Sequence, residues 1–172
     1  MKLTVRETVI FGLLGAMMFA SKVLMDALPN IHLLSMFTIL FTRVYRKKAL
    51  YPILIFVLLT GLYGGFGLWW IPFLYLWPLL WAAALLLPVK GNRTKQVILS
   101  AALCSAHGFL YGTLYAPAQA LLFGLDFNGM LAWIAAGLGF DMLHGISNFC
   151  TGLLIVPLGD LLHRLNRGLN GR

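Results

Sequence analysis

The sequence has few charged residues. Lys, Arg, Asp and Glu make up 10% of its 172 residues, whereas about a quarter of a soluble domain is charged. Acidic side chains are the scarcest of these, since five Asp and Glu stand against thirteen Lys and Arg. With 60% of its residues hydrophobic, the chain has too little polar surface to cover a soluble domain. We therefore expect an integral membrane protein.

The sequence also lacks the short motifs that identify common catalytic and nucleotide-binding sites. It contains no HExxH zinc motif, no GxSxG nucleophile elbow and no glycine-rich phosphate-binding loop. A metal site is conceivable from Cys104, His107, Asp141, His144 and Cys150, but the Cys104-x-x-His107 spacing is weak support for it. We therefore expect a protein that is not an enzyme and binds neither a metal nor a cofactor of its own. If ATP hydrolysis supplies energy for its function, we expect partner subunits to bind and hydrolyse the ATP.

Long apolar runs separated by short polar segments predict a bundle of transmembrane helices. A membrane-spanning helix needs roughly 20 apolar residues, so this chain has room for about six spans and no separate soluble domain. We expect an all-α integral membrane protein that forms one domain over residues 1–172. Its six spans are expected at about 8–28, 31–45, 49–66, 68–89, 96–125 and 130–162.

The basic residues predict how these spans are oriented. Twelve of the thirteen fall before the first span, in alternate connections or after the last span, and only Lys22 falls on the other side. The twelve are Lys2, Arg6, Arg43, Arg46, Lys47, Lys48, Lys90, Arg93, Lys95, Arg164, Arg167 and Arg172. Because basic residues concentrate in cytoplasmic segments, both the N-terminus and the C-terminus are expected in the cytoplasm.

The last apolar run carries Asp141, His144 and Asn148, which share one helix face at spacing i, i+3, i+7. An Asp in the middle of a membrane helix costs roughly 2.5–3.5 kcal/mol on insertion scales and normally faces the bundle interior. His107 falls at a similar depth in the preceding span, ~16 Å from the end of its run. Asp141 and His144 are thus expected to pair with each other, with His107 or with a ligand, and a purely structural pair remains an alternative.

Two further stripes of residues suggest contacts on helix faces. His107, Tyr111, Tyr115 and Gln119 follow one another at intervals of four and form a polar, aromatic stripe. This stripe serves either a solute or structural hydrogen bonds between helices. Trp77 and Trp133, in the outer half of the bundle, are candidates for stacking on a flat ligand.

The first span carries Gly12, Ala16 and Ala20 at spacing i, i+4, i+8. Small residues at this spacing allow the backbone of another helix to approach closely. The stripe therefore predicts either packing inside this bundle or a docking face for a separate membrane subunit.

The six-span pattern, the cytoplasmic termini and the Ala16-x-x-x-Ala20 motif in the first helix together resemble the S-components of energy-coupling factor (ECF) transporters. The run Asp-Met-Leu-His-Gly-Ile-Ser-Asn-Phe at 141–149 resembles the last helix of some uncharacterised Firmicute S-components. The segment Pro29-Asn30-Ile31-His32-Leu33 resembles their first outer loop. The resemblance covers essentially the whole chain.

The resemblance implies a multi-pass protein of the bacterial cytoplasmic membrane that captures a vitamin or related micronutrient outside the cell. The protein would carry the solute inward, and it would do so in a complex with a transmembrane coupling subunit and two cytosolic ATPase subunits. Nucleic acid is not an expected partner. The coupling subunit would dock on Gly12, Ala16 and Ala20. The family's pocket, transferred to this sequence, selects Asn30, Trp77, Tyr111, Tyr115, Gln119 and Trp133 as its lining, with Asp141 and His144 at its floor.

Several alternatives remain open at this stage. The solute could be a corrinoid, a pyridoxine-like molecule, a queuosine precursor or a pantothenate-like molecule. The energising subunits could be dedicated to this protein or shared with other transporters. Two other functions compete with solute binding: a structural or regulatory membrane subunit, and a small intramembrane enzyme that uses Asp141 and His144 on a lipid.

Overall fold

The computed structural model describes residues 3–28 and 30–170, with side chains described as far as 166. Within these ranges the chain is helical and contains no β-strand. The helices are α1 (Val5–Met25), α2 (Leu34–Tyr45), α3 (Leu50–Gly64), α4 (Phe73–Ala84), α5 (Arg93–Phe109), α6 (Tyr111–Phe123), α7 (Phe127–Gly152) and α8 (Ile155–Asn170), with short 3-10 helices η1 (Arg46–Ala49) and η2 (Leu68–Trp70). Of the residues named above, Lys2, Pro29 and Arg172 lie outside the described residues, as does the side chain of Arg167.

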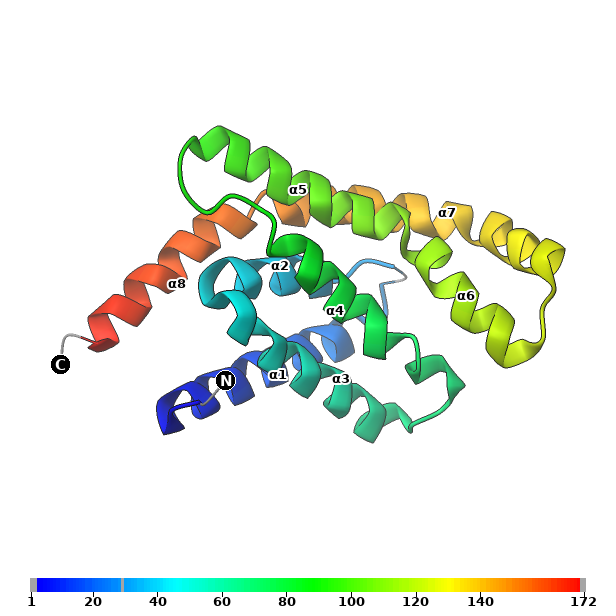
Figure 1. Ribbon diagram of the computed structural model, residues 1–172, viewed down its shortest axis with the longest axis horizontal. Coiled ribbons are helices and arrows are strands. Elements are labelled where there is room, and N and C mark those ends of the chain that lie inside the picture. The colour runs from blue at the N-terminus through cyan, green and yellow to red at the C-terminus, as the bar shows by residue number, and fades with distance from the viewer. Residues whose placement is uncertain (1–2, 29, 171–172) are drawn as a thin grey trace.

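From α1 to α5 successive helices run back and forth between two ends of the molecule, whereas α6 continues the direction of α5 and α8 that of α7 (Figure 1). Four helical stretches are long and apolar enough to cross a membrane, and Leu68–Ala84 is a shorter apolar one. The four are Val5–Met25, Leu34–Gly64, Arg93–Phe123 and Phe127–Gly152. The second stretch reverses direction at Arg46, whose backbone has φ 52° and ψ −125°, and so becomes the pair α2 and α3. The expectation of an all-helical protein with several helices that can span a membrane is confirmed.

Helix α2 lies at the centre of the bundle. Residues 34–43 are all buried, and α2 contacts α1, α4, α5, α7 and α8. Its sequence explains this position, because apolar side chains lie all round the helix and such a helix is stable only where every face is covered. The few polar groups it carries are small or paired; the Thr42 hydroxyl, for example, donates to the Thr38 carbonyl at 2.6 Å.

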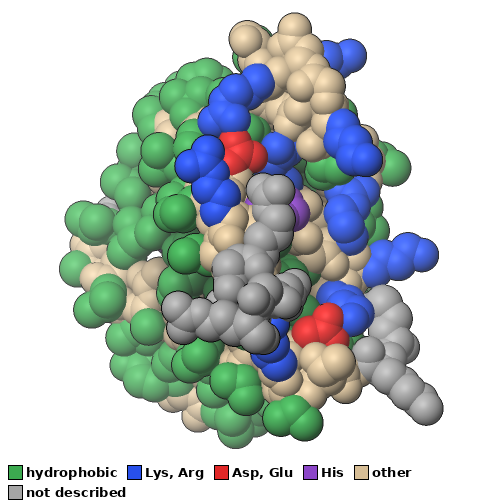
Figure 2. Space-filling view, turned by 90° about the vertical axis from the view of Figure 1, so that its left-hand side faces the viewer, with side chains coloured by type: hydrophobic (Ala, Val, Ile, Leu, Met, Phe, Trp, Pro, Cys, Tyr) green, Lys and Arg blue, Asp and Glu red, His purple; other side chains and the backbone are tan. Residues whose placement is uncertain are grey.

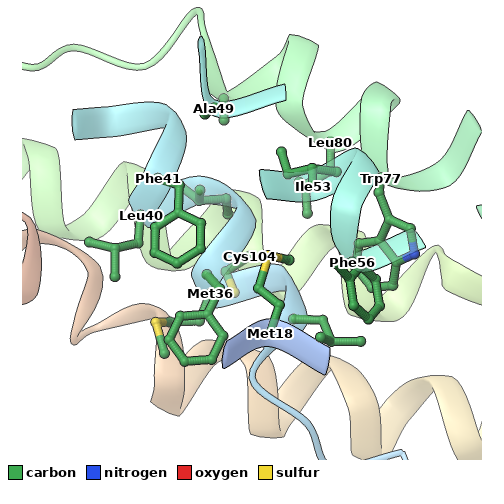
Figure 3. Close-up of a cluster of buried hydrophobic side chains, with 14 of the residues drawn as sticks. Met18, Met36, Leu40, Phe41, Ala49, Ile53, Phe56, Trp77, Leu80 and Cys104 are labelled. Atoms are coloured by element: carbon green, nitrogen blue, oxygen red, sulfur yellow. The ribbon is translucent and has the colours of Figure 1, made fainter. Parts of the chain in front are cut away.

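A cluster of buried hydrophobic side chains joins α2 to its neighbours (Figure 3). It includes Met18 of α1, Met36, Leu40 and Phe41 of α2, Ala49, Ile53 and Phe56 at η1 and α3, Trp77 and Leu80 of α4 and Cys104 of α5. Trp77 is fully buried and packs edge-on against Phe56, with ring centroids 5.6 Å apart. This core holds α4 and α5 at fixed positions beside α2.

Three of the expected spans differ from the helices in the structure. The stretch 96–125 is divided into α5 and α6 at Leu110, whose backbone has φ −97° and ψ 1°. The stretch 130–162 is divided into α7 and α8 by a turn at 153–154. The cause of the second break is Pro157, which cannot donate a hydrogen bond to residue 153 and is tolerated only in the first turn of a helix.

The third difference is at 68–89, where η2 comes first and α4 then ends at Ala84. The Leu85 carbonyl accepts a hydrogen bond from Arg46 Nη2 at 2.6 Å. The chain leaves the helix there, although the residues that follow are still apolar.

Basic side chains gather at one end of the bundle, which we call the basic end (Figure 2). The start of α1, η1, the α4–α5 connection and the end of α8 meet there (Figure 1). Lys48 of η1 pairs with Glu7 of α1 at 2.5 Å, and Arg93 of α5 pairs with Asp160 of α8. Arg43, which is 9% exposed, donates to Gln96 at 2.6 Å and lies 3.8 Å from Asp160. The pairs of Asp160 tie α8 to α2 and α5, and the Lys48–Glu7 pair ties η1 to α1.

Candidate functional site

Two neighbouring cavities lie at the end of the bundle opposite the basic end. The larger one, which we call the groove, has a volume of about 440 Å³. The smaller one has a volume of about 210 Å³. Asn30 and Tyr111 line both cavities and therefore form the wall between them.

Helices α6 and α7 supply most of the groove. The structure brings six of the eight residues expected to bind a solute to its lining: Asn30, Tyr111, Tyr115, Gln119, Trp133 and Asp141. Gly112, Gly137 and Phe140, which the sequence analysis did not select, complete the lining. Because every fourth residue of a helix returns to the same face, the stripe of Tyr111, Tyr115 and Gln119 faces this space from α6.

The aromatic groups of the groove are held in fixed positions. Tyr115 and Trp133 are stacked, with centroids 5.8 Å apart and an interplanar angle of 17°. The Tyr115 hydroxyl donates to the Trp69 carbonyl at 3.0 Å. Gln119, in contrast, has no hydrogen-bond partner for its amide within the described part of the chain. The groove therefore combines a rigid aromatic wall with a free amide.

Asn30 reaches both cavities from the loop between α1 and α2. Its backbone φ is 56°, in the left-handed region that Asn tolerates better than most residues. The Asn30 carbonyl accepts a hydrogen bond from the Ser147 hydroxyl at 3.4 Å, which attaches the loop to α7.

Asp141 pairs with neither histidine. Its two carboxylate oxygens accept the Gly112 backbone N–H, each at 3.1 Å. Gly112 lies in the first turn of α6, so the carboxylate is placed at the positive end of that helix. A Cβ atom at position 112 would collide with the carboxylate. The expected Asp141–His107 or Asp141–His144 pair is thus replaced by a helix-capping contact, and Asp141, which is 6% exposed, also lines the groove.

Trp77 and His144 lie deeper than the other expected site residues. Trp77 lines the smaller cavity together with His32 and is fully buried. His144, 1% exposed, lines neither cavity but contacts rings that do. Its centroid is 4.5 Å from that of His32 and 5.1 Å from that of Tyr111. His144 therefore lies beneath both cavities.

His107 belongs to a buried chain of hydrogen bonds. Its Nδ1 lies 3.0 Å from the Ser35 hydroxyl, which accepts from Asn148 Nδ2 at 3.1 Å. The sequence analysis did not select Ser35; the only sign of its role is a polar residue within an otherwise apolar run, which many packed helices carry.

His32 is the one histidine of this region that lies in a loop rather than on a helix. Burial lowers the pKa of His32, and the nearby His144 and His107 lower it further. The pKa is lowered because the protonated imidazolium is the charged form of histidine, and both desolvation and neighbouring positive charge disfavour it. His32 is therefore uncharged at neutral pH.

The small residues expected to form a docking face lie on the outer surface of α1. Ala16 and Ala20 are exposed, and a Cβ atom at Gly12 would meet no other atom within 4 Å. Gly15 is the small residue that packs inside the bundle, since a Cβ there would lie 2.6 Å from Ile55 Cγ2 of α3. Packing within this bundle therefore does not account for the Gly12, Ala16 and Ala20 stripe.

Among residues 3–28 and 30–170, no three His, Cys, Asp or Glu side chains are arranged to hold a metal ion. Both cysteines are free thiols, Cys104 buried and Cys150 exposed. What the site offers is hydrogen-bonding and aromatic surface. Comparison of the chain with protein-family models, with curated proteins and with solved structures finds no match.

Proposed function

We propose that this chain is the solute-binding S-component of an ECF-type importer. It would capture a vitamin or related micronutrient outside the cell and deliver it inward. A transmembrane coupling subunit and two cytosolic ATPases would provide the energy, so this chain itself would be neither an enzyme nor a binder of ATP. The membrane would be the bacterial cytoplasmic membrane.

The observation that carries the proposal is the groove. Ligand sites are typically concave, largely apolar and fitted with a few polar groups that fix orientation. The groove has this character, with Tyr115 and Trp133 as stacking surface and Gln119 and Asp141 as polar groups. A flat, partly aromatic, polar solute fits this combination.

The arrangement of the two ends supports the same proposal. Helices α1, α2, α3 and α4, the pair α5–α6, and α7 each run between the basic end and the opposite end (Figure 1). With the basic end in the cytoplasm, they would make six crossings, and α8 would lie at the cytoplasmic side with both termini. The groove would then open outside the cell, where a solute is captured.

The exposed small residues of α1 supply the partner surface that this function needs. Membrane helices associate through close packing at small residues rather than through a hydrophobic driving force. Ala16 and Ala20 lie on a face that nothing in the described part of this chain covers, as a docking face for a coupling subunit requires.

Native mass spectrometry of the detergent-purified protein tests the proposal. We expect a stoichiometric adduct with the mass of a small molecule, either after purification or after incubation with a panel of vitamins. Lipid alone, or no adduct even with the panel, would contradict solute binding and favour a structural or regulatory subunit.

Changes at Asp141 and His144 are expected to weaken solute binding in a protein that still folds. In Asp141→Asn the side chain keeps its shape and an oxygen for the Gly112 N–H but loses its charge, so we expect about tenfold weaker binding. His144→Ala removes a ring that contacts His32 and Tyr111 and is expected to weaken binding at least as much. Isothermal titration calorimetry with the identified solute measures both affinities.

Asp126→Asn is the matched control for Asp141→Asn. Asp126 caps α7 through the Gly129 N–H at 2.7 Å, and it does not line the groove. Because Asn is as good an N-cap as Asp, this variant should bind the solute with unchanged affinity. Unchanged affinity in both Asp141→Asn and His144→Ala would remove the site assignment.

A further inference from the structure

Polar atoms without partners converge beneath the smaller cavity. Those with no hydrogen-bond partner among the described protein atoms are His32 Nδ1, Trp77 Nε1, His107 Nε2, both ring nitrogens of His144 and Asn148 Oδ1. Buried polar atoms are nearly always hydrogen-bonded, because an unmade bond leaves the full cost of desolvation. Such a concentration of unpaired polar atoms in one place indicates a site where a ligand supplies the missing hydrogen bonds.

The four rings that carry most of these atoms form one cluster, which we call the histidine chamber: His32, Trp77, His107 and His144. They come from the α1–α2 loop, α4, α5 and α7. The His32 centroid lies 4.5 Å from that of His144 and 6.2 Å from that of Trp77. The centroids of Trp77 and His107 are 5.5 Å apart. Of the four rings, His32 and Trp77 line the smaller cavity, and His144 and His107 pack directly behind them.

The hydrogen-bond chain behind the chamber favours one tautomer of His107. Asn148 Nδ2 donates to the Ser35 hydroxyl at 3.1 Å and to the Cys104 carbonyl at 3.2 Å. Ser35 Oγ is thus an acceptor from Asn148, and its own hydrogen is free to be donated to His107 Nδ1 at 3.0 Å. With Nδ1 as the acceptor, the neutral ring carries its proton on Nε2. His107 Nε2 makes no hydrogen bond of good geometry among the described protein atoms, and neither does Trp77 Nε1. The backbone of Leu76 is the protein group closest to pairing with the His107 ring.

The carboxylates nearest these donors are already engaged. Asp141 is occupied by the Gly112 N–H, and Asp26 is paired with Lys22 at 2.9 Å on the lining of the smaller cavity. An occupant of the chamber is thus met by aromatic faces and N–H donors and, among the described residues, by no unpaired charge. A cation would find no counter-ion there, and an anion only uncharged donors.

We propose that the histidine chamber and the smaller cavity above it are a subsite for an uncharged, flat ring that carries hydrogen-bond acceptors such as carbonyl oxygens. This inference rests on the proposed function, solute capture, and defines the chemistry of one part of the solute. Trp77 and His107 donate to the acceptors, and His144 adds one donor and one acceptor. Because Asn30 and Tyr111 line both cavities, the remainder of the solute extends past Tyr111 into the groove.

Two bicyclic probes of similar size test the chemistry of the chamber. Quinazoline-2,4-dione is uncharged and carries two carbonyl acceptors, whereas N-methylquinolinium is a cation without an acceptor. Isothermal titration calorimetry on the full-length protein in detergent measures the affinity of each. We expect quinazoline-2,4-dione to bind and N-methylquinolinium neither to bind nor to compete with it.

Variants of the chamber connect this binding to the proposed donors. Trp77→Phe keeps an aromatic ring in the core and removes the N–H, and His107→Phe removes the second donor. Each should weaken binding of quinazoline-2,4-dione roughly tenfold, the effect of one lost hydrogen bond of about average strength. His163→Phe, at an exposed position of α8, is the matched control and should leave the affinity unchanged.

Three results would overturn the inference: equal affinity in wild type, Trp77→Phe and His107→Phe; tighter binding of N-methylquinolinium than of the dione; or tight binding of Ni²⁺ or Zn²⁺ that His107→Phe abolishes. Native mass spectrometry separates this inference from the proposed function. If wild type and both chamber variants retain a solute equally, the subsite is wrong and solute capture stands. If wild type retains no solute and binds neither probe, both are wrong.

Discussion

Replacement of Ala16 or Ala20 by tryptophan is expected to reduce solute uptake by cells to background and to leave solute binding unchanged. Both alanines are exposed on α1, so a larger side chain there can extend away from the bundle. A tryptophan would, however, hold a partner helix several ångströms further away and prevent the close packing on which membrane helices depend. Under the proposed function, the step that would be lost is coupling, and capture of the solute would be retained.

Two measurements together make this result specific. Uptake of labelled solute by cells would report the complete proposed importer, whereas calorimetry on the purified variant would report solute capture alone. Ala102→Trp is the matched control, because Ala102 is an exposed alanine on α5 and its replacement should affect neither quantity. Normal uptake in both Ala16→Trp and Ala20→Trp would show that this face of α1 does not bind a coupling subunit.

The sequence contains enough information to predict the helices and most of the groove lining. Apolar runs fix where helices form, and a repeat of four places Tyr111, Tyr115 and Gln119 on one face. For α1 the sequence predicts a stripe of small residues but not what the stripe packs against. The spacing of Gly12, Ala16 and Ala20 does not distinguish internal packing from docking, and the distinction depends on which face of α1 meets α3. The structure gives that inner position to Gly15.

The partner of Asp141 could not be predicted from the sequence, for a physical reason. Depth counted along continuous helices brings Asp141 level with His107, but the helix breaks at Leu110. The break leaves the Gly112 N–H without a partner inside a helix. A free backbone donor of this kind cannot be recognised from the residue type. The carboxylate pairs with this N–H, and His107 turns instead toward Ser35 of the central helix α2.

The closeness of α5, which carries His107, to α7, which carries His144, depends on glycines. A Cβ atom at Gly108 would lie 2.8 Å from the Cα and N atoms of Gly145. A Cβ at Gly152 would lie 2.8 Å from the Cα of Ala101. The Ser105 hydroxyl donates to the Gly145 carbonyl at 2.9 Å within the same contact. Because the atoms that would be struck at these positions are mainly backbone atoms, no side-chain rotation can make room.

We therefore expect Gly108→Val to lower the Tm of the purified protein by about 10 °C and to abolish solute binding. Overpacking costs about 1–3 kcal/mol where side chains can adjust, and here two helices must separate instead, so the cost falls at the upper end of that range. The separation moves His144, the residue next to Gly145, away from Tyr111 and His32. Thermal unfolding in detergent and calorimetry with the solute measure the two effects.

Gly139→Val is the control that makes this prediction specific to the helix crossing. Gly139 also lies on α7, but a Cβ there would meet no atom within 4 Å, so its replacement should leave the Tm and solute binding near their wild-type values. The two variants make the same chemical change in neighbouring helices and differ only in what the new side chain meets. Equal Tm values for Gly108→Val and Gly139→Val would mean that α5 and α7 do not touch through their backbones, and the placement of His144 beneath both cavities would then be wrong as well.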